Sequence, residues 1–227
     1  MVVDRLRREE FNKRRVVKVS RYTESVCKLC RREGIKLFLK GNRCYTDKCE
    51  IEKRNFPPGL HGHNKIKLTQ YGVQLREKQK LRRIYGLTER QFSRFYGIAA
   101  RQKGNKGECL LSLLERRLDN VVYSLGFAAS RKNARQLVNH GFILIDGKKV
   151  DIPSFVVRIG NTIELKEKIK SNVNVQSSIS SSAKQAVPRW LELDPVSFKA
   201  TVKTLPERQD ISILVQEQLV VELYSKH

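Results

Sequence analysis

Four of the five cysteines are spaced as the ligands of a metal site. Cys27, Cys30, Cys44 and Cys49 form the pattern C-x2-C-x13-C-x4-C, in which a loop separates two close pairs. Thiolates in such an arrangement can surround one tetrahedral Zn²⁺ ion, and four protein ligands leave no open position for a reacting water. The pattern therefore predicts a structural metal site. Four cysteines also suit an iron–sulfur cluster, and that alternative stays open.

Two disulfide bonds, or four ordinary thiols, are the other interpretations of these cysteines. No apolar stretch of the secretory type occurs in residues 1–15, so we expect a cytoplasmic protein, where disulfides are rare. The basic neighbours Lys28, Arg31 and Arg43 would favour the thiolate form that binds metal. Cys109 has no partner in the pattern and is expected to be a small buried side chain.

The charge of the chain indicates a polyanionic partner. The 227 residues carry 46 Lys and Arg against 23 Asp and Glu, a net charge of +23. The excess is +18 over residues 1–120, +5 over 121–170 and zero over 171–227. A sustained excess of this kind favours nucleic acid. A membrane is disfavoured, because no run approaches the roughly 18 apolar residues of a span and the cations alternate with turns.

Two predicted helices concentrate the basic residues. In the first, residues 69–85, only Glu77 offsets the cations between 76 and 83, so their mutual repulsion calls for a polyanion. In the second, residues 131–139, Arg131 and Arg135 are four positions apart and share a face, with Lys132 beside them. A solvated charged helix is the alternative for the first of these. We favour an RNA-facing role for both.

Helical patterns dominate the first half of the chain. Thr88 opens a capping box with Gln91, and the apolar positions that follow indicate a helix whose buried face includes Phe92 and Phe95. Leucines and valines at intervals of three and four predict one amphipathic helix over residues 108–125. Ser130 is expected to cap the helix 131–139.

Strand patterns follow that last helix. Residues 142–145, 154–158 and 162–165 are predicted as strands, with Asp146-Gly147 as a hairpin turn after the first of them. The Ser-rich residues 171–183 are expected to be a linker or a weak helix. Apolar alternation predicts further strands within 211–223, and Trp190 with Leu191 should anchor the tail in a core.

These patterns predict an α+β fold with a mostly helical N-terminal lobe, a four-cysteine knuckle, and a small domain of helices on an antiparallel sheet. The expected organisation is listed from the N-terminus: a basic arm at 1–22, the knuckle at 23–50, a helical lobe at 51–107, the sheet-containing domain at 108–170, a linker at 171–184, and a tail at 185–227 that packs back on the body.

The chain resembles the family of the fourth protein of the bacterial small ribosomal subunit. The resemblance runs from about Arg21 to Lys226 and is carried by CKLCRREG, GNRCYTDKC, PPGLHG, LREKQKLRRIYGLTERQF, LLERRLDNVVYSLGFAASRKNARQLVNHGFILIDGKKVDIPSF and EQLVVELYSK. The middle unit is similar to the small RNA-binding domain named after that protein. Residues 1–20 precede the usual start of the family, and 171–183 replace a segment that is normally helical and charged.

The resemblance implies a primary binder of small-subunit ribosomal RNA that nucleates assembly of the five-prime domain and affects translational accuracy together with the fifth small-subunit protein. It also implies contacts with the third protein and with messenger RNA where it enters the subunit. The metal ligands it implies are the four cysteines above. The RNA-binding residues it implies are Arg76, Lys78, Lys80, Arg82, Arg83, Arg131, Lys132, Arg135, Lys148 and Lys149.

Other functions fit the sequence less well. An RNA-modifying enzyme would need a separate catalytic domain, and neither a P-loop, a dinucleotide fingerprint nor a catalytic constellation is evident, so we expect no enzyme and no small-molecule substrate. A zinc-dependent DNA-binding regulator would need a recognition helix and usually a dimer seam. Within the resemblance, the alternative role is an RNA-binding translational regulator of the protein's own operon.

Overall fold

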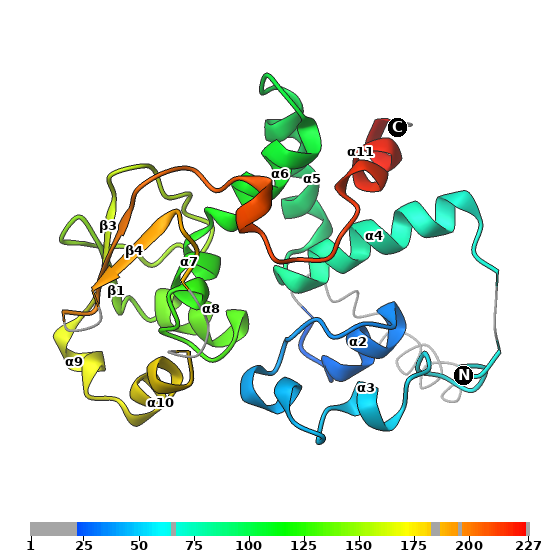
Figure 1. The fold of residues 1–227 in the computed structure, drawn as a ribbon, viewed down its shortest axis with the longest axis horizontal. Coiled ribbons are helices and arrows are strands. Elements are labelled where there is room, and N and C mark those ends of the chain that lie inside the picture. The colour runs from blue at the N-terminus through cyan, green and yellow to red at the C-terminus, as the bar shows by residue number, and fades with distance from the viewer. Residues whose placement is uncertain (1–21, 65–66, 183–186, 195–196, 226–227) are drawn as a thin grey trace, which may run out of the picture.

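The computed structural model describes residues 22–64, 67–182, 187–194 and 197–225. Apart from Tyr22, the predicted basic arm at 1–22 lies outside the described residues. Two bodies lie side by side (Figure 1), one wholly helical and one built on a sheet. In the described parts of the chain, no helix is both long and apolar enough to cross a membrane.

The helical body is made from the N-terminal half of the chain and its last helix. Its elements are α2 (Cys27–Glu33), η1 (Gly41–Tyr45), α3 (Glu50–Lys53), α4 (Gln70–Ile84), α5 (Glu89–Ala100), α6 (Lys106–Glu115) and α11 (Glu217–Ser225). Their apolar faces share one core, in which Leu81, Phe92 and Leu110 are fully buried. Thr69 and Thr88 cap α4 and α5 by accepting backbone N–H groups.

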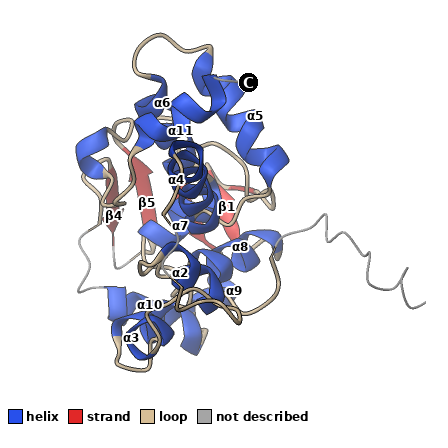
Figure 2. Ribbon diagram, turned by 90° about the vertical axis from the view of Figure 1, so that its right-hand side faces the viewer, coloured by secondary structure: helices blue, strands red, loops and turns tan. Residues whose placement is uncertain are grey.

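The second body packs helices on a five-stranded antiparallel sheet. Its elements are α7 (Leu118–Ser124), α8 (Arg131–Asn139), β1 (Ile143–Ile145), β2 (Lys148–Lys149), β3 (Thr162–Leu165), α9 (Glu167–Lys170), α10 (Val173–Ser182), β4 (Leu191–Asp194) and β5 (Lys199–Val202). The strand order is β2-β1-β3-β5-β4, and Figure 2 shows β5 next to β4 with β1 farther across. Trp190 and Leu191 are buried in its core, as predicted.

Local signals in this body are confirmed. Ser130 accepts the N–H of Asn133 and so caps α8. Asp146 and Gly147 both have positive φ, at 50° and 76°. Positive φ at both central residues is the requirement of the tight turn that matches the twist of a hairpin, and it joins β1 to β2 here. The described residues therefore form an α+β fold.

The single helix predicted over residues 108–125 is wrong, because the chain breaks between α6 and α7. Arg117 is extended at the break, with ψ 135°, and the N–H of Leu118 bonds the carbonyl oxygen of Phe155 at 2.8 Å. The leucines on either side enter different cores: Leu114 belongs to the helical body and Leu118 to the sheet body. The three-and-four spacing continues across this turn, and so hides it.

The predicted strand at 154–158 is also wrong. Only an isolated bridge between Arg117 and Val156 forms there, since this segment pairs with the extended break rather than with the sheet. The sheet contains β4 and β5 instead, and neither strand was predicted from the sequence. Their short alternations, Leu191 with Leu193 and Ala200 with Val202, lie on either side of a turn.

The tail is helical where strands were predicted. No strand forms over 211–216, and residues 217–225 are α11, which buries Val220 and Leu223 against α4 and α6. Apolar residues at 219, 220, 221, 223 and 224 fit either period, and the contact with α4 decides between them. The Ser-rich segment is the helix α10, whose Val175 and Ser178 are buried, rather than an extended linker.

Candidate nucleic-acid interface

The four predicted metal ligands lie in one part of the helical body. Cys27 and Cys30 are on α2, Cys44 is in η1, and Cys49 precedes α3. Burial, with a smaller contribution from negative charge on the other three thiols, raises the pKa of Cys30 to about 11, and a hydrogen bond from the backbone N–H of Leu37 opposes this rise. The N–H of Lys40 donates to Sγ of Cys44 at 3.4 Å.

This neighbourhood is not a formed metal site. Over the described ranges, no group of three His, Cys, Asp or Glu side chains is arranged to hold a metal ion. All four cysteines are free thiols, so the disulfide alternative is not realised either. The predicted metal knuckle is therefore not confirmed, and zinc remains a proposal that is taken up below.

Carboxylates from other elements already balance much of the charge on α4. Glu33 on α2 pairs with Arg83 and, at 3.3 Å, with Arg76. Glu89 on α5 lies 2.7 Å from Lys78 and 3.7 Å from Arg82. Lys80 pairs with Glu77 of its own helix. The expectation that only Glu77 offsets these cations is wrong. Glu33 and Glu89 lie outside this helix in the sequence, and the fold brings both carboxylates to it.

Burial outweighs the ion pairs of Glu33 in setting its pKa. Desolvation raises the pKa of that carboxyl even though Arg83 and Arg76 lower it, and desolvation likewise lowers the pKa of Arg83. The side chain of Glu33 is only 1% exposed. This cluster therefore joins α2 to α4 inside the body, and its arginines have limited charge to offer a ligand.

The three basic residues of α8 differ in their surroundings. Arg131 lies over the rings of Tyr123 and Tyr85, at 4.5 and 5.3 Å, and donates from Nε to Asn120 at 2.7 Å. Arg135 pairs with Asp119 at 3.2 Å, a carboxylate that also binds buried Arg117. Lys132 is exposed to solvent. Only Lys132 of the three is wholly available to a partner.

A groove brings two of the predicted basic sets together. It has a volume of about 410 Å³, and its walls include Arg82 and Arg83 of α4 and all three basic residues of α8. These sets are nearly fifty residues apart in sequence. Lys148 and Lys149 do not line it and lie on the β1–β2 hairpin, where Lys149 is 3.7 Å from Asp151.

A buried polar network fixes the angle between the two bodies at this groove. Tyr85 donates its hydroxyl to Glu115 at 2.5 Å, and Asn120 donates to the same carboxylate at 2.6 Å. Asn120 then accepts from Arg131. Burial, followed by the charge of Glu115, raises the pKa of Tyr85, so the phenol stays protonated. Tyr85 and Glu115 belong to the helical body, whereas Asn120 and Arg131 belong to the sheet body.

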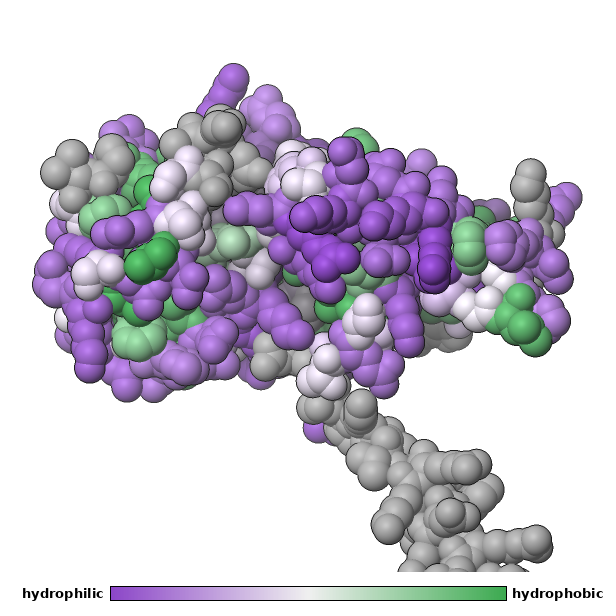
Figure 3. Space-filling view, turned by 90° about the horizontal axis from the view of Figure 1, so that it is seen from below, coloured by the Kyte–Doolittle hydropathy of each residue, from purple (hydrophilic) through white to green (hydrophobic). Residues whose placement is uncertain are grey.

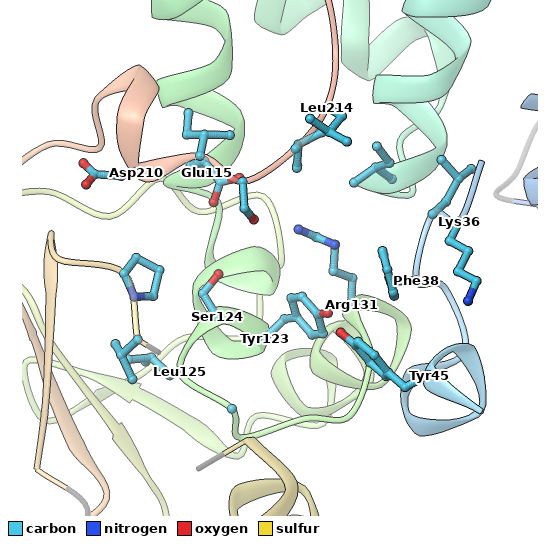
Figure 4. A pocket seen from close by; sticks show the side chains of 18 of the residues that line it. Lys36, Phe38, Tyr45, Glu115, Tyr123, Ser124, Leu125, Arg131, Asp210 and Leu214 are labelled. Carbon is cyan, nitrogen blue, oxygen red and sulfur yellow. The ribbon is translucent and has the colours of Figure 1, made fainter. Parts of the chain in front are cut away.

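A larger cavity of about 1060 Å³ lies behind this network, between the bodies. Figure 4 shows Glu115, Tyr123 and Arg131 lining it, between Tyr45 and Phe38 on one side and Asp210 on the other. On the outside, the face seen in Figure 3 is mostly hydrophilic, with apolar residues in small separate patches. Such a face suits a polar partner better than an apolar one.

Sequence reasoning missed three exposed arginines, two on α5 and one at its C-cap. Arg90, Arg94 and Arg101 lie on the side opposite the buried Phe92 and Phe95. The prediction for this helix used only its apolar positions and did not consider its charged face. The signal that could have found them is their spacing of four and seven, which keeps charged side chains on one helical face.

Two family models match consecutive stretches of the chain. Residues 21–115 match the family model described as "Ribosomal protein S4/S9 N-terminal domain", and residues 116–163 match that of the "S4 domain". The two matches meet at the break between α6 and α7. A protein of Pelobacter propionicus named "Small ribosomal subunit protein uS4" is 58% identical over 208 residues, which is 92% of this chain and all of the relative.

The chain belongs to the uS4 family of ribosomal proteins. Two other uS4 proteins, from Geotalea daltonii and Geobacter sulfurreducens, are 58% and 57% identical over the same shares of both chains. Proteins of the uS4 family are structural and non-enzymatic, which agrees with the prediction that the chain is no enzyme. The names of these relatives give no support to the alternative of a regulator outside the ribosome.

Proposed function

We propose that this chain is a structural component of the small ribosomal subunit in the cytoplasm and binds its ribosomal RNA. The observation that carries the proposal is the similarity over the whole length of proteins named as small-subunit components, at 58% identity. The charge of +23 and the basic groove between the two bodies support it. The role is to bind and fold RNA, with no bond chemistry.

The proposed mechanism follows from the charges and from the rigid junction. Lysines and arginines at the groove would bind phosphates and release counterions, which makes the affinity depend on salt. The A-form major groove is too narrow for side chains, so specificity would come mainly from RNA shape. Because the network from Tyr85 to Arg131 holds the bodies at one angle, the chain can impose that angle on the RNA helices it contacts.

Finer parts of the role are proposed from the resemblance. The chain would bind a helix junction in the five-prime domain and nucleate assembly of the body of the subunit. With the fifth small-subunit protein it would influence translational accuracy. The third protein and messenger RNA on its way into the subunit would be further neighbours.

A structural Zn²⁺ ion held by Cys27, Cys30, Cys44 and Cys49 is also proposed, with an iron–sulfur cluster as the less favoured occupant. The proposal rests on the spacing of the four cysteines and on two hydrogen bonds: the backbone N–H of Leu37 donates to the thiol of Cys30, and that of Lys40 donates to Sγ of Cys44. Such hydrogen bonds stabilise thiolates around a metal. The ion would join α2, η1 and α3, which are too short to form a core of their own.

Binding assays with two nucleic acids test the proposed function. The full chain is titrated with folded five-prime-domain RNA of the small subunit and with duplex DNA of equal length, across a salt series. We expect the RNA to bind at least about a hundredfold more tightly at physiological salt, and both affinities to fall as salt rises. Equal affinity for the two would reduce the function to nonspecific polyanion binding.

A further inference from the structure

We propose that the outer face of α5 is a second contact for the RNA phosphate backbone, made by Arg90, Arg94 and Arg101. This inference rests on the proposed function and extends it beyond the groove. The set was not among the predicted RNA-binding residues. Unlike the paired cations of α4, its members are exposed and have no side-chain partner among the described residues.

The three arginines form one row along the helix. At about 3.6 residues per turn, positions 90, 94 and 101 fall within roughly 40° of one another around the axis. Phe92, Phe95 and Ala99 occupy the opposite side and are buried in the core of the helical body. All three arginines are exposed. The row therefore lies on a helix whose opposite face is packed in the core, which fixes the position of the row.

The charge of this row is not balanced within the described residues. None of the three guanidinium groups has an ion pair, a side-chain hydrogen bond or a ring contact there, whereas the five cations of α4 are all paired. Like charges four apart on a helix destabilise it slightly. A row of unpaired arginines thus has a cost in the free protein that an anionic ligand would remove.

Gly97 lies within the row, and packing inside the protein does not account for it. It is in the interior of α5, where glycine is less favourable than alanine. A Cβ atom built on it would meet nothing within 4 Å, and its φ is not positive. Glycine at such a place allows another backbone to approach closely. The missing side chain therefore points to a ligand that lies against the helix between Arg94 and Arg101.

The row continues the groove already described. Thr88 and Glu89, at the start of α5, line that groove, and Arg90 follows directly. After the helix, Lys103 and Lys106 extend the positive charge into the next turn, and both are exposed. One strand of RNA could thus lie in the groove and then follow α5 away from it.

The chemistry of this face favours RNA over a protein partner. Guanidinium groups bind phosphate oxygens in a bidentate manner, and a regular row suits a regular series of phosphates. A protein interface would need an apolar centre. Here Ile98, at 40% exposure, is the one large apolar side chain of α5 that the described structure leaves exposed.

Two triple variants of the full chain test the row. One changes Arg90, Arg94 and Arg101 to alanine, and the matched control changes Lys168, Arg189 and Lys203 to alanine, which removes the same charge from exposed positions of the other body. In a salt series with five-prime-domain RNA, the row variant should lose about 2 to 3 from the slope of log K against log salt, because each phosphate contact contributes nearly one. The control should lose less than about one.

The outcomes separate the two proposals. If both triple variants lose the same amount from the salt slope, the arginine row makes no specific phosphate contact, and the proposed function is unaffected. A parent protein that does not prefer this RNA to duplex DNA would overturn both.

Substitution of Gly97 tests the close approach without changing charge. Gly97→Gln should keep or raise the melting temperature, since glutamine is the better helix former, and should weaken RNA binding by about tenfold through steric exclusion. Gly97→Ala gives the same helical gain with only a methyl group and should bind more tightly than Gly97→Gln. If both variants bind like the parent, the RNA does not lie against this turn.

Discussion

Replacing Cys27 and Cys30 with serine is expected to release the proposed zinc ion and loosen residues 23–50, while residues 118–165 keep their structure. A structural zinc site supplies on the order of 10 kcal/mol to the folding of a small metal domain, so this is the largest effect we expect. The loss should spread into the helical body, because Cys30, Cys49 and Leu37 belong to its core. The sheet body has a core of its own and should be protected.

Metal analysis together with hydrogen exchange measures this prediction. The parent should contain one equivalent of zinc, and the double variant none, with faster exchange confined to the helical body. Cys109→Ser is the matched control, because this cysteine is far from the other four in sequence. A parent without metal, or a double variant that unfolds as a whole, would contradict the account.

The second large effect separates two adjacent residues of α8. Arg131→Ala should destabilise the fold by about 2 to 4 kcal/mol, since it removes a partly buried hydrogen bond and two ring contacts and leaves the buried Asn120 without its donor. Lys132→Ala should leave stability within about 0.5 kcal/mol, because its side chain is exposed.

RNA affinity should be lower for Lys132→Ala than for Arg131→Ala when both are measured well below the melting temperature. This order is the reverse of the expected order of their losses in stability. Lys132→Ala removes a phosphate contact and should lower the salt slope by about one. Denaturant titration and RNA titration of the same two preparations give both quantities. Equal stability of the two variants would show that Arg131 faces RNA rather than joining the bodies.

Short-range sequence signals predicted much of the fold correctly. Ser130, Asp146-Gly147 and Thr88 each act through the few residues around them, and the structure has the cap or turn that each predicts. The errors fall where a distant segment decides the outcome. The break at Arg117 depends on Phe155, and the helical tail depends on α4. Neither contact produces a periodic pattern of residues in the sequence from which it could be predicted.

The same distinction applies to the candidate site. Composition and charge located the basic regions, and the family resemblance gave the residues. Sequence could not show that Glu33 and Glu89 reach back to α4, or that Arg131 is enclosed by two tyrosines. It also could not show that the described residues provide no carboxylate partner for Arg90, Arg94 and Arg101, because such pairing depends on which side chains fold nearby.

Cofractionation with ribosomes tests the central claim most directly. Cells expressing the tagged full chain are lysed, the ribosomal particles are separated on a sucrose gradient, and the chain is followed by immunoblot at low and at moderate salt. We predict that it sediments with the small subunit and its assembly intermediates in near-stoichiometric amount. A chain that stays at the top of the gradient, or that follows bulk RNA without regard to particle size, would contradict the assignment.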